Sequence, residues 1–295
     1  MTTGKILLTG AKGQLGQTFL SHFAQSSLSR KYTLIASDRI DMDLTRLESI
    51  FSFLSLNKPS VIVNCGAYTA VDSAETEFEL AKKVNDEAVG YISNWSSEND
   101  CRLIHISTDF VFDGVKREPY LPSDFACPRG VYGKTKFAGE ERILESHNDN
   151  GVIVRTSWLY SEFRQNFVKT MIRLMAEKPD LSVVTDQVGS PTSAHSLADI
   201  LLKVIECQSF SGILHWCDGA SISWYDFALE IQKLAFRHGL LKREIAIKPL
   251  MTDDYFSLAE RPSYSVLDRS HTLEQLGVIA TDWRVELEKV IERIL

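Results

Sequence analysis

Tyr132 and Lys136, four residues apart, are the first pair in the sequence with a spacing that could support chemistry. They lie in the stretch RGVYGKTKFAGEE (129–141), where we expect a helix to begin. On a helix, positions four apart lie on one face, about one turn from each other. A phenol has a pKa near 10, and a cation within roughly 4–6 Å lowers that value. The pair is therefore a candidate proton donor with a tuning cation, although a packed tyrosine beside a solvated lysine would show the same spacing.

Glycines near the N-terminus form a candidate phosphate site. In LLTGAKGQLG (7–16), Gly10, Gly13 and Gly16 separate a strand-like run from a helical run. A tight turn here lets the backbone approach a pyrophosphate, and the following helix presents its N-terminal N–H groups to the anion. This context predicts dinucleotide binding, whereas small residues packed in a tight turn are the simpler alternative.

The end of the second expected strand bears on the choice of cofactor. Asp38 could hold a ribose 2′-hydroxyl, and Arg39 could accept a 2′-phosphate. Because both are present, NADH and NADPH both remain open. The stretch 41–44 follows, where a short loop could lie under the adenine. An aspartate that caps the next helix is at least as good an interpretation.

Polar and small residues follow three further expected strands. In an open parallel sheet, ligands bind beyond the carboxyl ends of the strands. The stretches concerned are NCGAYTAVD (64–72), STDFVFDG (107–114) and TSWLY (156–160). The first offers an unhindered backbone at Gly66–Ala67 for a flat nicotinamide, and the second offers the hydroxyl of Thr108.

Apolar runs alternate with helical patterns in the first half of the chain. Buried parallel strands read as unbroken runs of valine, isoleucine and leucine. The alternation predicts an α/β fold, a Rossmann-type doubly wound parallel sheet. The expected strands are 5–9, 32–37, 60–67, 102–107 and 151–157, and the expected helices are 14–25, 44–55, 79–100 and 134–146.

The pattern loosens after Trp158, which predicts a smaller α/β substrate-binding lobe. Helices are expected at 165–178, at 196–207 and after Ser223, where Asp226 completes a capping box. Strands are expected at 181–186 and 212–217. We predict an NAD(P)-binding domain over 1–156, to which the chain returns near 186–207, and a lobe formed mainly by 157–295.

Composition narrows the possible partners and compartments. The 295 residues are 44% hydrophobic and carry a net charge of −7, which argues against a nucleic-acid partner. No 18-residue apolar run is present, so no membrane span is expected, and the N-terminus lacks the features of a signal peptide. The five cysteines show no CxxC spacing and the histidines no HExxH motif, so we expect reduced thiols, a cytoplasmic location and no metal site.

Taken together, these motifs resemble the dTDP-4-dehydrorhamnose reductase family of the extended short-chain dehydrogenase/reductase superfamily. The resemblance covers nearly the whole chain, and no single motif is decisive. Besides the glycine turn, STDFVFDG and YGKTK, it rests on YTAVDSAE (68–75), RTSWLY (155–160), NFVKTMIRL (166–174), DQVGSPT (186–192) and RPSYSVLD (261–268).

The resemblance implies a reaction and a set of site residues. The reaction is NADPH- or NADH-dependent reduction of the C4 ketone of dTDP-4-dehydro-6-deoxy-L-mannose to dTDP-L-rhamnose, for cell-surface polysaccharides such as lipopolysaccharide. The implied catalytic residues are Thr108, Tyr132 and Lys136, and Thr108, Asp109, Trp158 and Arg261 would contact the sugar nucleotide. The cofactor residues are Gly10, Gly13, Gln14, Leu15, Gly16, Asp38, Arg39, Asp43, Leu44, Gly66, Ala67, Tyr68, Tyr132 and Lys136.

The chain departs from the family at several positions. Phe110 replaces a common tyrosine, and Gly130 replaces an asparagine. Some members form a dimer bridged by Mg²⁺ through glutamates, and Thr18 and His195 occupy two of those positions. Magnesium prefers oxygen ligands, chiefly carboxylates, so a bridge is doubtful, and a monomer or weak homodimer is expected.

Other charged residues are interpreted more simply. Arg261 could clamp a diphosphate or be a surface charge. Glu140 and Glu141 are expected on a solvated helix face, as are Glu286, Glu288 and Glu292.

Two alternative functions stay open. One is a reductase or 4-epimerase for a related nucleotide deoxysugar, such as a dihydrostreptose-type product. The other is a regulatory subunit that resembles the family but has little reductase activity. The segments DQVGSPT and TSWLY favour the enzyme, because they belong to the substrate lobe in the family.

Overall fold

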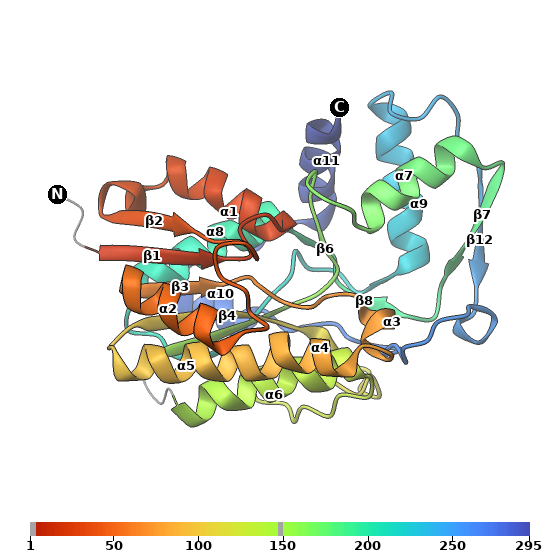
Figure 1. The fold of residues 1–295 in the computed structure, drawn as a ribbon. Helices are drawn as coiled ribbons and strands as arrows, with labels where there is room; N and C mark the ends of the chain where they lie inside the picture. The colour runs from red at the N-terminus through yellow and green to blue at the C-terminus, as the bar shows by residue number, and fades with distance from the viewer. Residues whose placement is uncertain (1–3, 147–149) are drawn as a thin grey trace.

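A six-stranded parallel sheet forms the centre of the larger domain (Figure 1). The computed structural model describes residues 4–146 and 150–295, so residues 1–3 and 147–149 of the predicted cofactor domain lie outside the described part. The strand order is β10-β5-β4-β3-β1-β2. The strands are β1 (Gly4–Thr9), β2 (Tyr32–Ala36), β3 (Val61–Asn64), β4 (Arg102–Thr108), β5 (Gly151–Thr156) and β10 (Gly212–Trp216).

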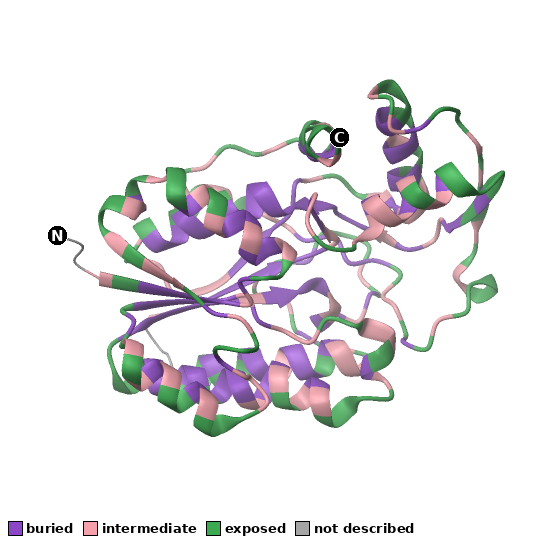
Figure 2. Ribbon diagram, turned by 45° about the horizontal axis from the view of Figure 1, so that its top comes forward, coloured by how far each residue is buried: buried purple, intermediate pink, exposed green. Residues whose placement is uncertain are grey.

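Helices cover both faces of this sheet, which confirms the predicted fold class. Successive residues of a strand point to opposite faces. Leu8 of β1 therefore packs on the side of α1 and α8, and Leu7 packs on the side of α2, α5 and α6. The strands are buried between the helical layers, whose outer faces are exposed (Figure 2). These helices are α1 (Gln14–Gln25), α8 (Ala194–Glu206), α2 (Leu47–Asn57), α5 (Ala88–Glu98) and α6 (Val131–Ser146).

The helix expected over 79–100 is interrupted by a π-helical turn. It consists of α4 (Phe78–Lys82), the π-helix η2 (Lys83–Glu87) and α5. A π-turn inserts an extra residue into a helix and is often found at functional sites. Here it places Asn85 in the interior, at 0% exposure.

The smaller lobe has its own core, built around Phe227 and Trp283. The predicted capping box is present: the Ser223 side chain accepts from the Asp226 backbone, and the Asp226 carboxylate accepts from Ser223. The lobe contains α7 (Phe167–Glu177), α9 (Trp224–Arg237), α11 (Trp283–Ile294) and the parallel pair β7 (Asp180–Val184) and β12 (Ala246–Leu250).

Two short strand pairs lie between these parts, and the chain crosses back to the sheet. The pairs are β6 (Leu159–Tyr160) with β9 (Thr192–Ser193), and β8 (Val188–Gly189) with β11 (Ile222–Ser223). Helix α8 packs on α1, and β10 extends the sheet beside β5, so the return continues to Trp216. The remaining elements are η1 (Ser27–Arg30), α3 (Val71–Ala74), η3 (Asp109–Val111), η4 (Thr252–Asp254) and α10 (Ser270–Leu276).

Candidate active site

The glycine turn after β1 is too crowded for side chains. Gly10 has a φ of +64°, and a Cβ on it would lie 2.9 Å from the carbonyl carbon of Cys65. A Cβ on Gly16 would lie 2.3 Å from the carbonyl oxygen of Gly10. Gly13 is the N-cap of α1 and has no side chain to occupy the first N–H groups of the helix. The turn thus presents bare backbone and a helix N-terminus, which fits a pyrophosphate.

The two residues after Gly13 can serve a phosphate only through their backbone. Leu15 packs its side chain into the core between the sheet and α8. Gln14 donates from Nε2 to the Leu159 carbonyl at 3.2 Å, and its Oε1 accepts from Ser161 at 3.3 Å. Gln14 therefore ties the phosphate turn to the start of the smaller lobe.

A cavity of about 640 Å³ opens beside this turn, at the side expected for the adenosine. Asp38 lines it and forms an ion pair with Lys12, a cation that the sequence did not single out. The Lys12 ammonium holds the pKa of Asp38 below its ordinary value. Arg39 is exposed. The other lining residues are Ala11, Gln17, Leu20, Ala36, Asp41, Glu162, Phe163 and Arg164.

The loop after β2 holds its own shape. Asp43 accepts from the Thr45 backbone at 3.0 Å and from the Thr45 hydroxyl at 2.8 Å. The N-cap of α2 is Arg46, so Asp43 does not cap that helix. Leu44 packs over the loop after β3, because a Cβ on Gly66 would lie 2.6 Å from Leu44 Cδ1.

The loop after β3 is fixed by hydrogen bonds from three elements. The Gly66 N–H donates to Thr9 Oγ1 at 2.9 Å. Asn85 brackets Tyr68: its Oδ1 accepts from the Tyr68 N–H at 2.9 Å, and its Nδ2 donates to the Tyr68 carbonyl at 3.0 Å. Nδ2 also donates to Thr135 of α6 at 3.2 Å. Asn85 is a site residue that sequence reasoning missed, because only the π-turn brings it inward.

Close helix packing brings Tyr132 and Lys136 to the end of β4. A Cβ on Gly133 would lie 2.2 Å from the Phe110 carbonyl oxygen, and one on Gly139 would lie 2.2 Å from that of Asn85. These two glycines let α6 approach β4 and the π-turn closely. The first turn of α6 is held by Glu75, whose carboxylate accepts from the Val131 N–H at 2.8 Å.

Tyr132 lies beside Thr108 and Asp109, but its pKa moves in the direction opposite to our expectation. Burial raises it to about 12, the Thr108 hydroxyl lowers it and the Asp109 carboxylate raises it. Lys136 does not act on it here, because its Nζ lies against the Ile106 carbonyl and His105 instead. Phe110, which replaces the usual tyrosine, packs edge-on against the ring at 5.6 Å.

Asp109 is buried and satisfied. It accepts from the Thr108 hydroxyl at 3.1 Å and from Ser265 at 2.5 Å. Burial raises its pKa to about 6.

The Lys136 side chain extends under the sheet end, where it is 2% exposed. Its Nζ donates to the Ile106 carbonyl at 2.6 Å and lies 3.0 Å from His105 Nε2. Burial lowers its pKa to about 8, while the Glu140 carboxylate acts in the opposite direction. The prediction of a solvated Glu140 was wrong: Glu140 is fully buried and pairs with Arg155.

Trp158 is linked to Asp109 through the short strands. Its φ is +48°, its ring stacks on Trp224 at 3.5 Å, and it covers Gly189. The neighbouring Val188 bonds to the 263–265 segment, whose Ser265 in turn donates to Asp109. The sequence did not indicate Trp224 as a site residue. Its ring stack with Trp158 is the observation that identifies it as one.

Arg261 precedes this segment and contacts the region after β3. It donates to Asp72 at 2.8 Å, so its guanidinium already has a carboxylate partner. A Cβ on Gly130 would lie 3.5 Å from the Glu260 carbonyl, which places this segment beside the start of α6.

The positions related to a metal bridge are occupied by other interactions. Thr18 donates to the Gln14 carbonyl within α1 at 2.9 Å. His195 lies 2.8 Å from His22 and 2.9 Å from Glu162.

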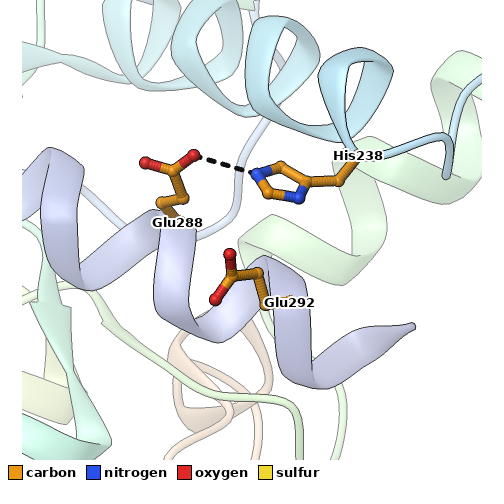
Figure 3. A group of neighbouring side chains, drawn as sticks. All are labelled: His238, Glu288 and Glu292. Atoms are coloured by element: carbon orange, nitrogen blue, oxygen red, sulfur yellow. Dashed lines mark hydrogen bonds and ion pairs between the residues drawn. The ribbon is translucent and has the colours of Figure 1, made fainter.

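A different group of metal-ligand types lies between α9 and α11 (Figure 3). His238, Glu288 and Glu292 each offer one ligand atom, all within 4.8 Å of one another. Glu288 Oε1 accepts from both His238 and Arg237 at 2.9 Å, so this oxygen is already engaged by two N–H groups. The prediction that this acidic face is solvated was wrong for Glu286, which is 7% exposed.

Comparisons with known proteins point to one family. The family model described as RmlD substrate binding domain matches residues 4–295. A dTDP-4-dehydrorhamnose reductase from Aggregatibacter actinomycetemcomitans is 36% identical, over 97% of this chain and 98% of its own length. The crystal structure of a dTDP-4-dehydrorhamnose reductase from Clostridium acetobutylicum is 37% identical and covers 98% of this chain and 99% of its own, with a TM-score of 0.90. The Bacillus anthracis dTDP-4-dehydrorhamnose reductase in complex with NADP is 33% identical and covers 99% and 100%, with a TM-score of 0.90.

Among the described residues, no helix is long and apolar enough to cross a membrane.

Proposed function

Because the chain belongs to the RmlD substrate binding domain family, we propose that it reduces the C4 ketone of dTDP-4-dehydro-6-deoxy-L-mannose to dTDP-L-rhamnose with NADPH or NADH. One observation carries the proposal. Tyr132 lies beside Thr108 at the carboxyl end of β4, and Lys136 donates to the Ile106 carbonyl of the same strand. This is the edge of a parallel sheet where ligands bind.

The chain's own residues fit a dinucleotide. The backbone of the Gly10–Gly16 turn and the N-terminus of α1 would hold the pyrophosphate, and Asp38 with Lys12 would face the adenosine ribose. The loop from Gly66 to Tyr68 would lie along the nicotinamide and its ribose. When bound, the reduced nicotinamide supplies the hydride for the ketone carbon.

Tyr132 supplies the proton for the oxygen at C4. At neutral pH its phenol is protonated, since its pKa lies near 12, and a general acid must begin in that state. Thr108 would orient the ketone oxygen, because its hydroxyl lies beside the phenol. The Lys136 amine lies one helical turn away, and as an ammonium it would stabilise the phenolate left after proton transfer.

The substrate would bind between the two parts of the molecule. Asp109 and the stacked pair of Trp158 and Trp224 are linked through the 188–189 and 263–265 segments. We infer a cytoplasmic enzyme, a monomer or weak homodimer, that serves cell-surface polysaccharide synthesis. A related nucleotide sugar is the alternative substrate.

The test is reduction of dTDP-4-keto-6-deoxy-L-mannose, followed by nicotinamide absorbance and by identification of the product sugar. Tyr132→Phe should bind NADPH almost normally and turn over at least about a hundredfold more slowly, as expected for loss of a general acid. Tyr91→Phe, on the exposed face of α5, is the matched control and should behave as wild type. Wild-type turnover by Tyr132→Phe would refute the role of Tyr132. Epimerised product without net oxidation of the cofactor would refute the reductase.

A further inference from the structure

A chain of buried polar groups runs under the candidate site from the loop after β3 to α6. The Gly66 N–H donates to Thr9 Oγ1 at 2.9 Å, and the Thr9 hydroxyl donates to Asn64 Oδ1 at 2.6 Å. Asn64 Nδ2 donates to His105 Nδ1 at 2.9 Å, and His105 Nε2 lies 3.0 Å from Lys136 Nζ. The four side chains are at most 2% exposed, so water does not compete with these bonds.

The direction of this chain has a consequence for Lys136. Because Asn64 donates to His105 Nδ1, that nitrogen carries no hydrogen. Burial holds the pKa of His105 well below its ordinary value, so the ring is neutral and its single hydrogen is on Nε2. An N–H directed at Lys136 requires a lone pair on Nζ. A neutral amine has one, and an ammonium has none.

We propose that His105 is a positioning residue that sets the proton state of Lys136, and that Asn64 and Thr9 set the orientation of His105. To accept from an ammonium, His105 must instead carry its hydrogen on Nδ1. Asn64 must then turn its amide oxygen toward the ring, which breaks the bond that Thr9 donates. With Asn64 Nδ2 placed toward the ring, the chain therefore favours the amine form of Lys136.

Other charges near Lys136 act against this preference or not at all. Glu140, one turn further along α6, favours the ammonium, but its carboxylate is engaged by Arg155 at 2.6 Å. Burial raises the pKa of the Cys65 thiol to about 12, so that group is neutral. The Ile106 carbonyl accepts from either form of the lysine. His105 is thus the neighbour that distinguishes the two forms by hydrogen-bond direction.

The chain also couples Lys136 to the ligand-binding loop. Its first donor is the Gly66 N–H, in the loop proposed to lie against the nicotinamide. A shift of that loop would withdraw the Gly66 N–H from the Thr9 hydroxyl, which orients Asn64 and, through Asn64, His105. The coupling of Lys136 to a bound nicotinamide rests on the proposed function. The effect of His105 on the pKa of Lys136 does not depend on that function.

The experiment titrates Lys136 directly, by ¹³C NMR of the full-length enzyme labelled at the lysine ε-carbon, without cofactor. Lys136→Arg assigns the signal. Asn64→Asp is the diagnostic variant, because a carboxylate cannot donate to His105 and so places the hydrogen on Nδ1. We expect it to raise the pKa of Lys136 by about one unit. Thr9→Val, which frees the Asn64 amide to rotate, should give a smaller rise in the same direction and serves if Asn64→Asp does not fold.

Controls separate a path through His105 from a general effect of charge or packing. In a His105→Phe background, the rise caused by Asn64→Asp should fall below half, whereas direct attraction by the new carboxylate would persist. His215→Gln changes another fully buried imidazole, on β10, which bonds to the Tyr120 carbonyl, and it should leave Lys136 unmoved. An unchanged or lowered Lys136 pKa in both Asn64→Asp and Thr9→Val, or an undiminished rise without His105, would overturn the proposal.

A pH profile then connects the titration to catalysis. If the ammonium is the active form, the alkaline limb of kcat/KM should move with the NMR value in each variant. A protein that shows the NMR shifts but reduces no dTDP-sugar would refute the proposed function and leave the role of His105 supported. If the alkaline limb of kcat/KM stays fixed while the pKa of Lys136 measured by NMR moves, the part that His105 plays in catalysis is refuted.

Discussion

Glu140→Gln tests the buried ion pair that supports the catalytic helix. Glu140 is 0% exposed and Arg155 2% exposed. They meet in a two-point contact, with Nε 3.0 Å from Oε1 and Nη2 2.6 Å from Oε2. The guanidinium also lies over the Phe112 ring at 5.1 Å, and its Nη1 has no hydrogen-bond partner in the described part of the chain. The glutamine keeps the shape of the side chain but leaves the arginine charged and buried.

The structure sets the size of the effect. Removing one partner of a buried pair destabilises a protein by about 3–5 kcal/mol, because the remaining charge stays unsolvated. Glutamine retains one acceptor oxygen, so we expect about 3 kcal/mol, the lower end of that range. At roughly 2–4 °C per kcal/mol for a protein of this size, the melting temperature should fall by about 6–12 °C.

Urea unfolding and calorimetry measure the loss, and the neighbouring glutamate is the control. Glu141 is exposed on the same helix, so Glu141→Gln should change the free energy of unfolding by less than about 0.5 kcal/mol. If Glu140→Gln falls within about 1 kcal/mol of this control, water reaches the Arg155 guanidinium and the burial argument is refuted. Because the Glu140 carboxylate favours the Lys136 ammonium, the same variant should also lower the pKa of Lys136.

Further predictions concern cofactor choice, metal and pH. Asp38 followed by Arg39 predicts catalytic efficiencies with NADH and NADPH within about tenfold of each other, or roughly 1.4 kcal/mol; a hundredfold preference would contradict it. Sedimentation should give the same mass with EDTA as with magnesium, and a mass that doubles only with magnesium would reveal a rebuilt bridge. The folded pKa of Asp109, about 6, lies above its ordinary value of 3.8, so this group's contribution to stability is complete below pH 4 and is lost as pH rises through 6. Asp109→Asn should remove that loss, measured as the difference in urea midpoint from wild type at pH 4.5 and pH 7.5.

Local patterns were sufficient to predict the layers of the fold. A parallel strand buried on both faces carries an unbroken apolar run, and residues 6–8 of β1, 61–63 of β3 and 152–154 of β5 are such runs. Gly10 was predictable for a similar reason, because its left-handed φ and the nearby Cys65 carbonyl tolerate no Cβ. The capping box at Ser223 involves two residues three apart, so it too is contained in the local sequence.

Pairs far apart in the chain were not predictable in this way. Glu140 is buried because it pairs with Arg155 on β5. The spacing of residues in α6 gives no indication of a partner on a strand. The π-turn that brings Asn85 inward has no strong sequence signature. Asn64 and His105 did leave a signal, since Asn64 ends the apolar run of β3 and His105 interrupts the apolar run of β4. A buried polar side chain needs a partner, so two of them on neighbouring strands could have suggested each other.

Lys136 shows where reasoning from helical spacing stops. A separation of four residues fixes the distance between Cβ atoms on one face, about 5–6 Å, and so places Tyr132 and Lys136 together. It does not fix where a four-carbon side chain ends. Here the buried His105 imidazole and the Ile106 carbonyl draw the Nζ under the sheet, and burial without a nearby cation raises the pKa of Tyr132. The tuning inferred from the sequence therefore depends on a second condition, a protonated Lys136 turned toward the phenol, and that condition is set by residues on β3 and β4 rather than by the helix that carries the pair.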